Sequence, residues 1–215
     1  TMKPELTVGR DKAIELLRGL VENSLPLGGV ISVCGMSGIG KSHLMREFFH
    51  SLPSSIQKVY WDLNNIPTEL LKTLVIEHSA KVIILDNLPH NARKIVQMIC
   101  TQQNQPVVLV ASQAPLDVAG EKLLLLESLE KSNDGLSTAS LQLYLHIYGA
   151  ICNHSNESSP RGNDYQVERI LSICDGVPLA IVLAARLSAT IGCSATYRAM
   201  EKSIGNLSVT WANPD

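Results

Sequence analysis

Aromatic residues, positive charge and long apolar runs are all scarce in this sequence of 215 residues. Aromatic side chains make up 4% of the chain and the formal net charge is −2, so the basic surface and the base-stacking surface typical of nucleic-acid-binding proteins are both missing. No apolar run approaches the roughly 20 residues of a membrane span, and no signal peptide precedes the first predicted helix. We therefore expect a cytoplasmic segment that binds neither nucleic acid nor membrane.

Paired cysteines and clustered histidines are absent as well. The five cysteines are odd in number and include no C-x-x-C pair, and the six histidines are scattered. This pattern argues against a disulfide framework or a Cys/His metal site, and it favours reduced, mostly buried thiols. Apolar residues make up 45% and charged residues 18%, which is an ordinary balance for a globular chain that buries a core.

The sequence does contain a phosphate-binding pattern, between residues 30 and 49. A β-branched run precedes the glycine-rich loop GMSGIGKS, and a predicted amphipathic helix follows it. The loop matches G-x-x-x-x-G-K-[ST] in full and has the strand and helix that the pattern requires. Glycine permits the bend around a phosphate, and the helix directs free N–H groups and its positive dipole end at the anion. The predicted binding residues are Gly35, Met36, Ser37, Gly38, Ile39, Gly40, Lys41, Ser42 and His43.

Lys41, Asp86 and Asn87 are the candidates for catalysis, and Ser42 and Asp86 are the candidates for metal binding. Lys41 is a point charge for the β- and γ-phosphates, and the Ser42 hydroxyl is a ligand for Mg²⁺. Asp86 ends an apolar strand and is predicted to hold Mg²⁺ through water or Ser42, with a helix cap as the alternative. Asn87 stands where many ATPases place a second carboxylate, but an amide cannot act as a base. Hydrolysis is therefore expected to be slow or absent.

Apolar strands alternate with amphipathic helices over residues 1–130, which predicts an α/β fold with a doubly wound parallel sheet. The predicted strands lie at residues 30–33, 58–63, 82–85, 107–111 and 123–126, and further helices are predicted at about 67–75 and 92–100. Ligands of such sheets bind at the carboxyl ends of the strands. Ser112 and Gln113 follow one strand, where they are either neutral γ-phosphate sensors or a polar strand exit.

The sequence pattern changes after residue 130, and residues 131–215 predict a small helical domain. A polar hinge covers residues 131–140, and a polar loop covers residues 153–164. Residues 141–151 fit both a helical and an alternating pattern. One helix is predicted to end at Gly176, the next to begin at Pro178, and a last helix to run over about 196–204.

Other chemically capable residues give weaker signals. Asp62, Asp117 and Glu121 have no partner at a telling spacing, and we interpret them as solvated. His43 and His90 are interpreted mainly as surface or packing residues. Three arginines are candidate phosphate sensors among which the sequence does not choose, namely Arg46, Arg93 and Arg186.

Four blocks stand in a recognisable order: TVGRDKAIELL, GMSGIGKS, VIILDNLPH with VLVASQAPLDVAGE, and CDGVPLAIVLAAR. Together they resemble the NB-ARC-like ATPase domain of signal-transduction ATPases with numerous domains (STAND), most closely that of AfsR and large LuxR-type transcription regulators. The resemblance extends over about residues 7–204. It implies a sheet order of 5-1-4-3-2, an adenine pocket lined by Val8, Gly9 and Arg10, and a base contact from Pro178 in the helical domain.

Two positions depart from that family's pattern. Gln113 stands where the family usually has Arg, and Pro89 stands where it commonly has Glu. The first change removes a fixed positive charge, and the second removes a candidate water-orienting carboxylate. Both changes affect the expectation of hydrolysis more than that of phosphate binding.

The resulting hypothesis is an ATP/ADP- and Mg²⁺-dependent switch domain of a signalling or transcription regulator, with slow hydrolysis at most. Its expected partners are the other domains of a larger regulator and, depending on the nucleotide, further copies of itself. The alternative is a nucleotide-binding interaction module that does not hydrolyse ATP. A small-molecule kinase on the same core is a weaker third reading, because neither an acceptor site nor a basic lid is evident.

Overall fold

The structure, a computed structural model, describes residues 7–65, 80–89, 92–101, 105–129, 138–152 and 164–212. The chain divides into two compact units, Thr1–Glu127 and Ser128–Asp215. Several expectations fall outside the described residues: the helix predicted at about 67–75, His90, residues 131–137 of the hinge and residues 153–163 of the polar loop.

The first unit is built on a five-stranded parallel sheet. The strands are β1 (Gly29–Cys34), β2 (Lys58–Asp62), β3 (Val82–Asp86), β4 (Val107–Ser112) and β5 (Lys122–Leu125). Their spatial order is β2-β3-β4-β1-β5, so the predicted α/β fold with order 5-1-4-3-2 is confirmed. The central strands β3 and β4 are buried on both faces, and this explains why they read as unbroken apolar runs rather than as alternating ones.

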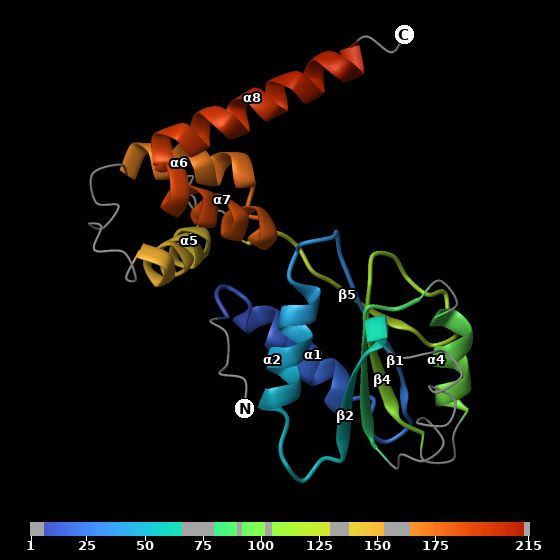
Figure 1. Cartoon of the computed structure of the whole chain (residues 1–215). Helices are drawn as coiled ribbons and strands as arrows, with labels where there is room; N and C mark the ends of the chain where they lie inside the picture. Colours follow the sequence, from blue (N-terminus) through green and yellow to red (C-terminus); the bar gives the residue numbers. More distant parts are fainter. Residues whose placement is uncertain are drawn as a thin grey trace. The chain divides into compact units, whose positions relative to one another are not determined.

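Helices cover both faces of this sheet (Figure 1). The helices α1 (Asp11–Glu22) and α2 (Lys41–Ser51) pack on one face, and α4 (Ala92–Cys100) packs on the other. Successive side chains of β1 point to opposite faces, so Ile31 joins the core under α1 and α2 while Val30 joins the core under α4. Side chains of β1 thus pack against helices on both faces of the sheet. The carboxyl end of β1, where the glycine-rich loop begins, lies between these two helical layers.

The described part of the second unit is helical. Its helices are α5 (Thr138–Cys152), α6 (Asp164–Cys174), α7 (Pro178–Ile191) and α8 (Cys193–Ala212). Residues 141–151 are therefore helical, and Tyr144 in that stretch is completely buried among Ile170, Ile181 and Ala185. Packing around this aromatic ring decides between the two patterns that the sequence allowed.

The turn between α6 and α7 shows why glycine is needed at residue 176. Asp175 and Gly176 both have positive φ, at 49° and 69°. A Cβ on Gly176 would lie 2.6 Å from the carbonyl oxygen of Leu129, and the amide of Leu129 donates to the Gly176 carbonyl at 2.8 Å. Pro178 then begins α7, so the predicted helix end and helix start are both confirmed.

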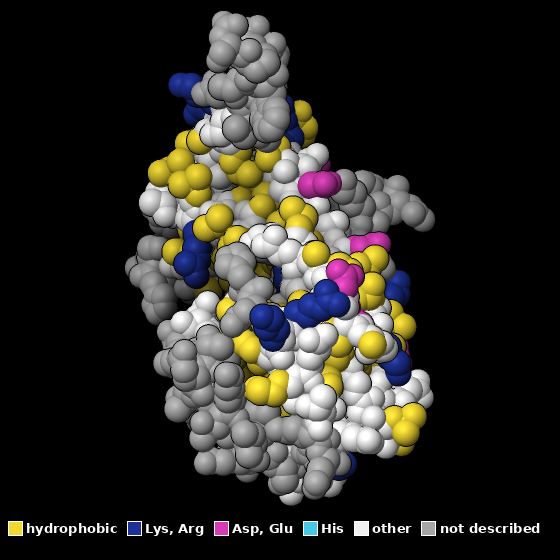
Figure 2. All heavy atoms as spheres, turned by 90° about the vertical axis from the view of Figure 1, so that its right-hand side faces the viewer, with side chains coloured by type: hydrophobic (Ala, Val, Ile, Leu, Met, Phe, Trp, Pro, Cys, Tyr) yellow, Lys and Arg dark blue, Asp and Glu magenta, His cyan; other side chains and the backbone are white. Residues whose placement is uncertain are grey.

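Apolar and charged side chains are interspersed on the face shown in Figure 2. Lysine and arginine side chains lie there beside a few acidic ones and a larger number of apolar ones. This mixture agrees with a net charge close to zero. None of the helices in the described ranges combines the length and the hydropathy needed to cross a membrane.

Candidate phosphate-binding site

The glycine-rich loop joins β1 to α2, and its backbone needs glycine at particular positions. Gly38 and Gly40 have φ values of 77° and 97°, in the left-handed region that residues with a Cβ rarely adopt. At Gly35 the constraint is space, because a Cβ there would lie 2.7 Å from the Leu126 carbonyl oxygen and 3.1 Å from Cγ2 of Ile39. Ile39, only 1% exposed, anchors the loop in the core. The loop is therefore held in one shape by packing beneath it and by glycine along it.

Lys41 folds back over this loop. Its Nζ donates to the carbonyl oxygen of Gly35 at 2.6 Å and to that of Met36 at 2.9 Å. Burial lowers the pKa of Lys41, and the nearby Cys34 and Asp86 partly offset that effect by favouring the charged form. The ammonium group therefore lies against the loop and donates to neutral carbonyl oxygens. An anionic ligand can replace these oxygens as its acceptor.

Asp86, at the carboxyl edge of the sheet, connects the end of β3 to α2 and β2 through hydrogen bonds. It is only 1% exposed, and its Oδ1 accepts from the Ser42 hydroxyl at 2.9 Å and from the backbone amide of Asn87 at 3.0 Å. Its Oδ2 accepts from the Tyr60 hydroxyl at 2.7 Å. Burial, together with this bond, raises the pKa of Tyr60, so Tyr60 remains a donor. The predicted Ser42–Asp86 pair is thus assembled, and a hydroxyl and a carboxylate are ligands suited to Mg²⁺.

The N-terminus of α2 has the features of an anion-binding site. The helix begins at Lys41 after Gly40 at its N-cap, and no side chain caps it. The first amides of a helix have no intrahelical partner, so this end can donate to phosphate oxygens and presents the positive end of the helix dipole. His43, in the first turn, shares a 2.9 Å hydrogen bond with the Thr7 hydroxyl.

The segment before α1 lies directly beside the loop, although it is far away in sequence. Arg10 is buried, and its guanidinium donates to the carbonyl oxygens of Ile39 and Glu127, both at 2.7 Å. Burial lowers its pKa. Gly9 adopts a positive φ of 65°, and Val8 is half-buried. The predicted base-binding residues Val8, Gly9 and Arg10 are thus adjacent to the predicted phosphate loop.

The remaining predicted residues occupy different positions. Ser112 ends β4 in register with Cys34, and its Oγ lies 3.4 Å from the Cys34 sulfur, so it reaches the edge at which the loop begins. Gln113 is exposed. Pro178 belongs to the second unit.

Asp62 and Glu121, for which the sequence offered no partner, both accept hydrogen bonds in the structure and remain partly exposed. Asp62 accepts at Oδ1 from the Asn87 side-chain amide at 2.8 Å and from the Asn64 backbone at 3.2 Å. Glu121 accepts from the buried Ser32 hydroxyl and, at 2.9 Å, from the amide of Leu116. Asn87 and Ser32 are distant in sequence from the carboxylates that they bind, and only a known strand order could have revealed those two pairs.

Hydrogen bonds shift the acidity of both carboxyls. The bond from Asn87 is the main reason that the pKa of Asp62 is lowered. Burial would raise the pKa of Glu121, but the bonds from Ser32 and from nearby backbone amides bring it below its usual value. Both side chains therefore stay ionised at neutral pH.

The Arg10 bridge predicts a loss of stability that Arg18, whose hydrogen bond is exposed, does not share. Arg10→Ala leaves two carbonyl oxygens without their donor, and we expect the free energy of unfolding to fall by about 2–3 kcal/mol. Arg10→Lys should recover only part of this loss, because an ammonium lacks the planar fork. Urea unfolding measures both variants. Arg18→Ala, which removes an exposed 3.3 Å hydrogen bond to Ser51, should change stability by less than about 0.5 kcal/mol. A loss in Arg10→Ala no larger than that in Arg18→Ala would contradict the bridge.

The strand order and the loop between β1 and α2 define the class of fold: this is the P-loop NTPase fold. Solved structures of known proteins share it. The replication initiator DnaA bound to AMPPCP and single-stranded DNA superposes with a TM-score of 0.57 at 14% identity, over 92% of this chain and 66% of that one. AMPPCP-bound DnaA from Aquifex aeolicus gives 0.55 and 15%, over 94% and 68%.

Further comparisons do not assign a family. A RuvB variant from Thermotoga maritima gives a TM-score of 0.53 at 14% identity, over 84% of this chain and 62% of that one. A STAND protein with a tetratricopeptide repeat sensor from Pyrococcus horikoshii gives 0.47 at 14%, over 88% and 30%. No protein-family model and no curated protein sequence matches the chain. At these identities the similarity establishes the fold alone.

Proposed function

We propose that this chain is an ATP/ADP-binding switch domain of a larger signalling or transcription regulator of the STAND, NB-ARC-like type. The observation that carries the proposal is the assembled phosphate loop, with Lys41 over it and Ser42 paired to the buried Asp86 at 2.9 Å. The ATP analogue AMPPCP in the DnaA structures supports the same class of ligand for this loop.

Each residue of the loop would have a defined task. Lys41 would exchange its two carbonyl acceptors for β- and γ-phosphate oxygens, since a charge-assisted bond to phosphate is the stronger one. Backbone amides of residues 38–43 would wrap the phosphates. The Ser42 hydroxyl and the Asp86 carboxylate would hold Mg²⁺ directly or through water. When bound, Mg²⁺ supplies charge neutralisation on the phosphates.

The switch would use contacts that link the loop to the end of the first unit. Arg10 joins Ile39 in the loop to Glu127, the last residue of that unit, so a change in the loop alters a bond at the connection. Val8, Gly9 and Arg10, with Pro178 from the second unit, would hold the base, and Ser112 and Gln113 would respond to the γ-phosphate. Nucleotide acts only through its different affinity for two arrangements of the units.

We also infer the setting in which such a domain works. The chain spans 66% of the length of one similar DnaA structure and 62% of that of RuvB. Its proposed partners are further domains of a regulator and, in the ATP state, further copies of itself, in the cytoplasm. The second candidate is a nucleotide-binding module without hydrolysis, favoured by the amide of Asn87 next to Asp86 and by the exposed Gln113.

The proposal is tested by the nucleotide content of the purified protein. The protein is denatured, and the supernatant is resolved by ion-exchange chromatography. We expect ADP close to one equivalent per chain or, if the protein is purified empty, saturable binding of ADP and Mg-ATP in a titration. A protein that contains no nucleotide and binds neither would overturn the proposal.

A separate variant tests the proposed contact between Pro178 and the base. Pro178→Ala should weaken ADP binding about three- to tenfold if Pro178 packs on the base, because an apolar contact of this size contributes about 1 kcal/mol. Pro53→Ala, at an exposed turn of the first unit, is the matched control and should bind ADP as the wild type does. Equal affinities in the two variants would exclude the contact from Pro178 while leaving the phosphate site intact.

A further inference from the structure

A carboxylate that orients the attacking water would assist ATP hydrolysis at this loop, and the residues next to the Ser42–Asp86 pair do not provide one. Both oxygens of Asp86 are already hydrogen-bonded, to Ser42, Asn87 and Tyr60. Asn87, the next residue, has an amide and cannot accept a proton as a base. Among the described residues, the neighbouring strand β2 offers the next carboxylate at this edge.

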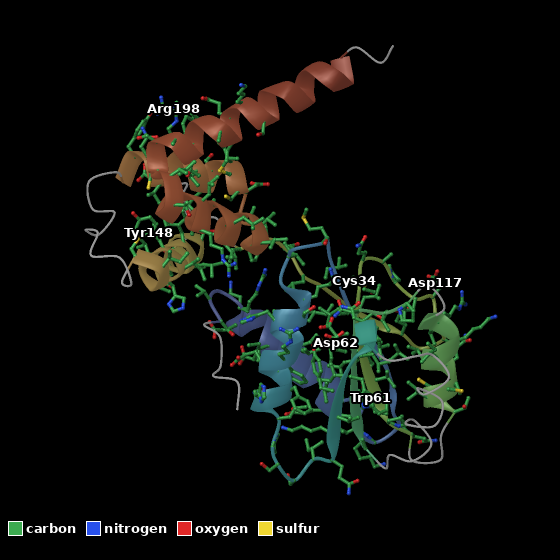
Figure 3. The ribbon with its side chains drawn as sticks, in the orientation of Figure 1. Cys34, Trp61, Asp62, Asp117, Tyr148 and Arg198 are labelled. Carbon is green, nitrogen blue, oxygen red and sulfur yellow. The ribbon has the colours of Figure 1, made fainter. Side chains whose placement is uncertain are left out.

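Asp62 is placed to supply it. It ends β2, in register with Asp86 at the end of the neighbouring strand β3, and adjacent strands of a sheet lie about 4.8 Å apart. Figure 3 shows Asp62 and Cys34, the last residue of β1, at the same edge of the sheet. Asp62 is thus on the edge where the glycine-rich loop begins.

The side chain of Asp62 is held there by Asn87. Asn87 has a positive φ of 55°, a conformation that asparagine tolerates better than most residues, and its Nδ2 donates to Asp62 Oδ1 at 2.8 Å. The bond from the Asn64 amide ends on the same oxygen. Oδ2 takes part in neither of these bonds, and the side chain is partly exposed, so it can accept a hydrogen bond from water.

Two other described carboxylates, Glu121 and Asp117, are less well placed. Glu121 precedes β5, whose first residue, Lys122, is in register with Ile31 in the middle of β1, and it is bound to Ser32 and Leu116. Asp117 lies in the segment between β4 and β5 and is exposed. Asp62 alone among these three is paired with a residue adjacent to Asp86.

We propose that Asp62 is the carboxylate that orients the attacking water for ATP hydrolysis, and that Asn87 is the positioning residue that holds Asp62. This inference rests on the proposed function. The oxygen of the water forms a bond to the γ-phosphorus while the bond from that phosphorus to the β–γ bridging oxygen breaks. ADP leaves with that electron pair. One proton of the water passes to Asp62 and then to solvent, and inorganic phosphate is released.

The lowered pKa of Asp62 fits a slow reaction. The bond from Asn87 keeps the carboxylate ionised at neutral pH, so it is ready to accept a hydrogen bond without prior deprotonation. The same bond makes it a weaker base, and a weaker base gives less assistance to proton transfer. Orientation of the water is thus its main contribution.

The experiment compares Asp62→Asn with the wild type in two assays on the same protein. Single-turnover hydrolysis of Mg-ATP is followed with enzyme in excess, and the affinity for ATP is measured by titration without turnover. The amide oxygen of asparagine can still accept the bond from Asn87, so the variant removes the charge and keeps the contact. Asp117→Asn is the matched control, since it makes the same chemical change at an exposed aspartate between β4 and β5.

We expect Asp62→Asn to lower the single-turnover rate by about 100-fold, the scale of the loss when a reacting group is misplaced by about 1 Å. Its ATP affinity should stay within about threefold of the wild type, because a partly exposed charge is screened. Asp117→Asn should match the wild type in both assays. An equal rate in Asp62→Asn and the wild type would overturn the inference, as would a wild type that binds ATP and forms no ADP. A wild type that does not bind ATP would instead overturn the proposed function.

Discussion

Lys41→Ala is expected to weaken binding of both ATP and ADP by about 100-fold or more. The lysine would contribute hydrogen bonds between an ammonium and phosphate oxygens, each worth about 1.5–3 kcal/mol, and about 2.7 kcal/mol corresponds to 100-fold in affinity. A nucleotide titration followed by calorimetry or by a fluorescent analogue measures the change. ATP should lose more affinity than ADP, since Lys41 can reach the γ-phosphate only in ATP.

The fold of that variant should be retained. Among the described residues, Lys41 donates to the carbonyl oxygens of Gly35 and Met36 in the loop, and burial already disfavours its charge. We therefore expect the free energy of unfolding without nucleotide to change by less than about 1 kcal/mol. Lys94→Ala, at an exposed position on α4, is the charge-matched control and should bind nucleotide normally. A Lys41→Ala protein that binds nucleotide as well as Lys94→Ala does would refute the proposed phosphate site.

Leu17→Ala is expected to lower the free energy of unfolding of the first unit by about 3–4 kcal/mol, within the range measured for fully buried leucines. Leu17 is completely buried on α1, in the core that also contains Phe48 and Ile84. Such a loss is a large part of the 5–15 kcal/mol typical of a domain, so the variant should unfold at a clearly lower urea concentration.

The residue before it provides the control. Leu16 is 61% exposed on the same helix, and alanine is the stronger helix former. Leu16→Ala should therefore change stability by less than about 0.5 kcal/mol. The comparison tests how α1 is rotated against the sheet, because a turn of one residue would exchange the two results. Equal losses in both variants would show that α1 is not seated as described.

Local patterns in the sequence were sufficient for the strands, for most of the described helices and for the loop. Buried β-branched runs can satisfy their backbone only in a sheet, and the glycine spacing before Lys41 and Ser42 constrains the chain within eight residues. Asp86 could be placed at the end of a buried strand because it directly follows such a run. The order of the strands came from the resemblance of four sequence blocks to a known class of ATPase domain.

Contacts between distant segments were not accessible to that reasoning. Arg10 is 117 residues from Glu127, and Asn87 is 25 residues from Asp62, so no spacing rule connects them. Residues 141–151 were ambiguous because apolar side chains occur on several sides of that stretch, and burial of Tyr144 decides for a helix.

The sequence by itself determined a parallel α/β sheet, a glycine-rich loop that ends in Lys41 and Ser42, and the place of Asp86 at the end of a buried strand. These features depend on neighbours in the chain, where conformational preference and hydrophobic period act directly. Tertiary structure alone decided that Arg10 binds the loop and that Ser32 binds Glu121. It also decided that Asp62 is in register with Asp86 and accepts a hydrogen bond from the Asn87 side chain. The physical reason is that strand pairing brings the ends of separate segments to one edge, and only a folded sheet fixes which ends meet.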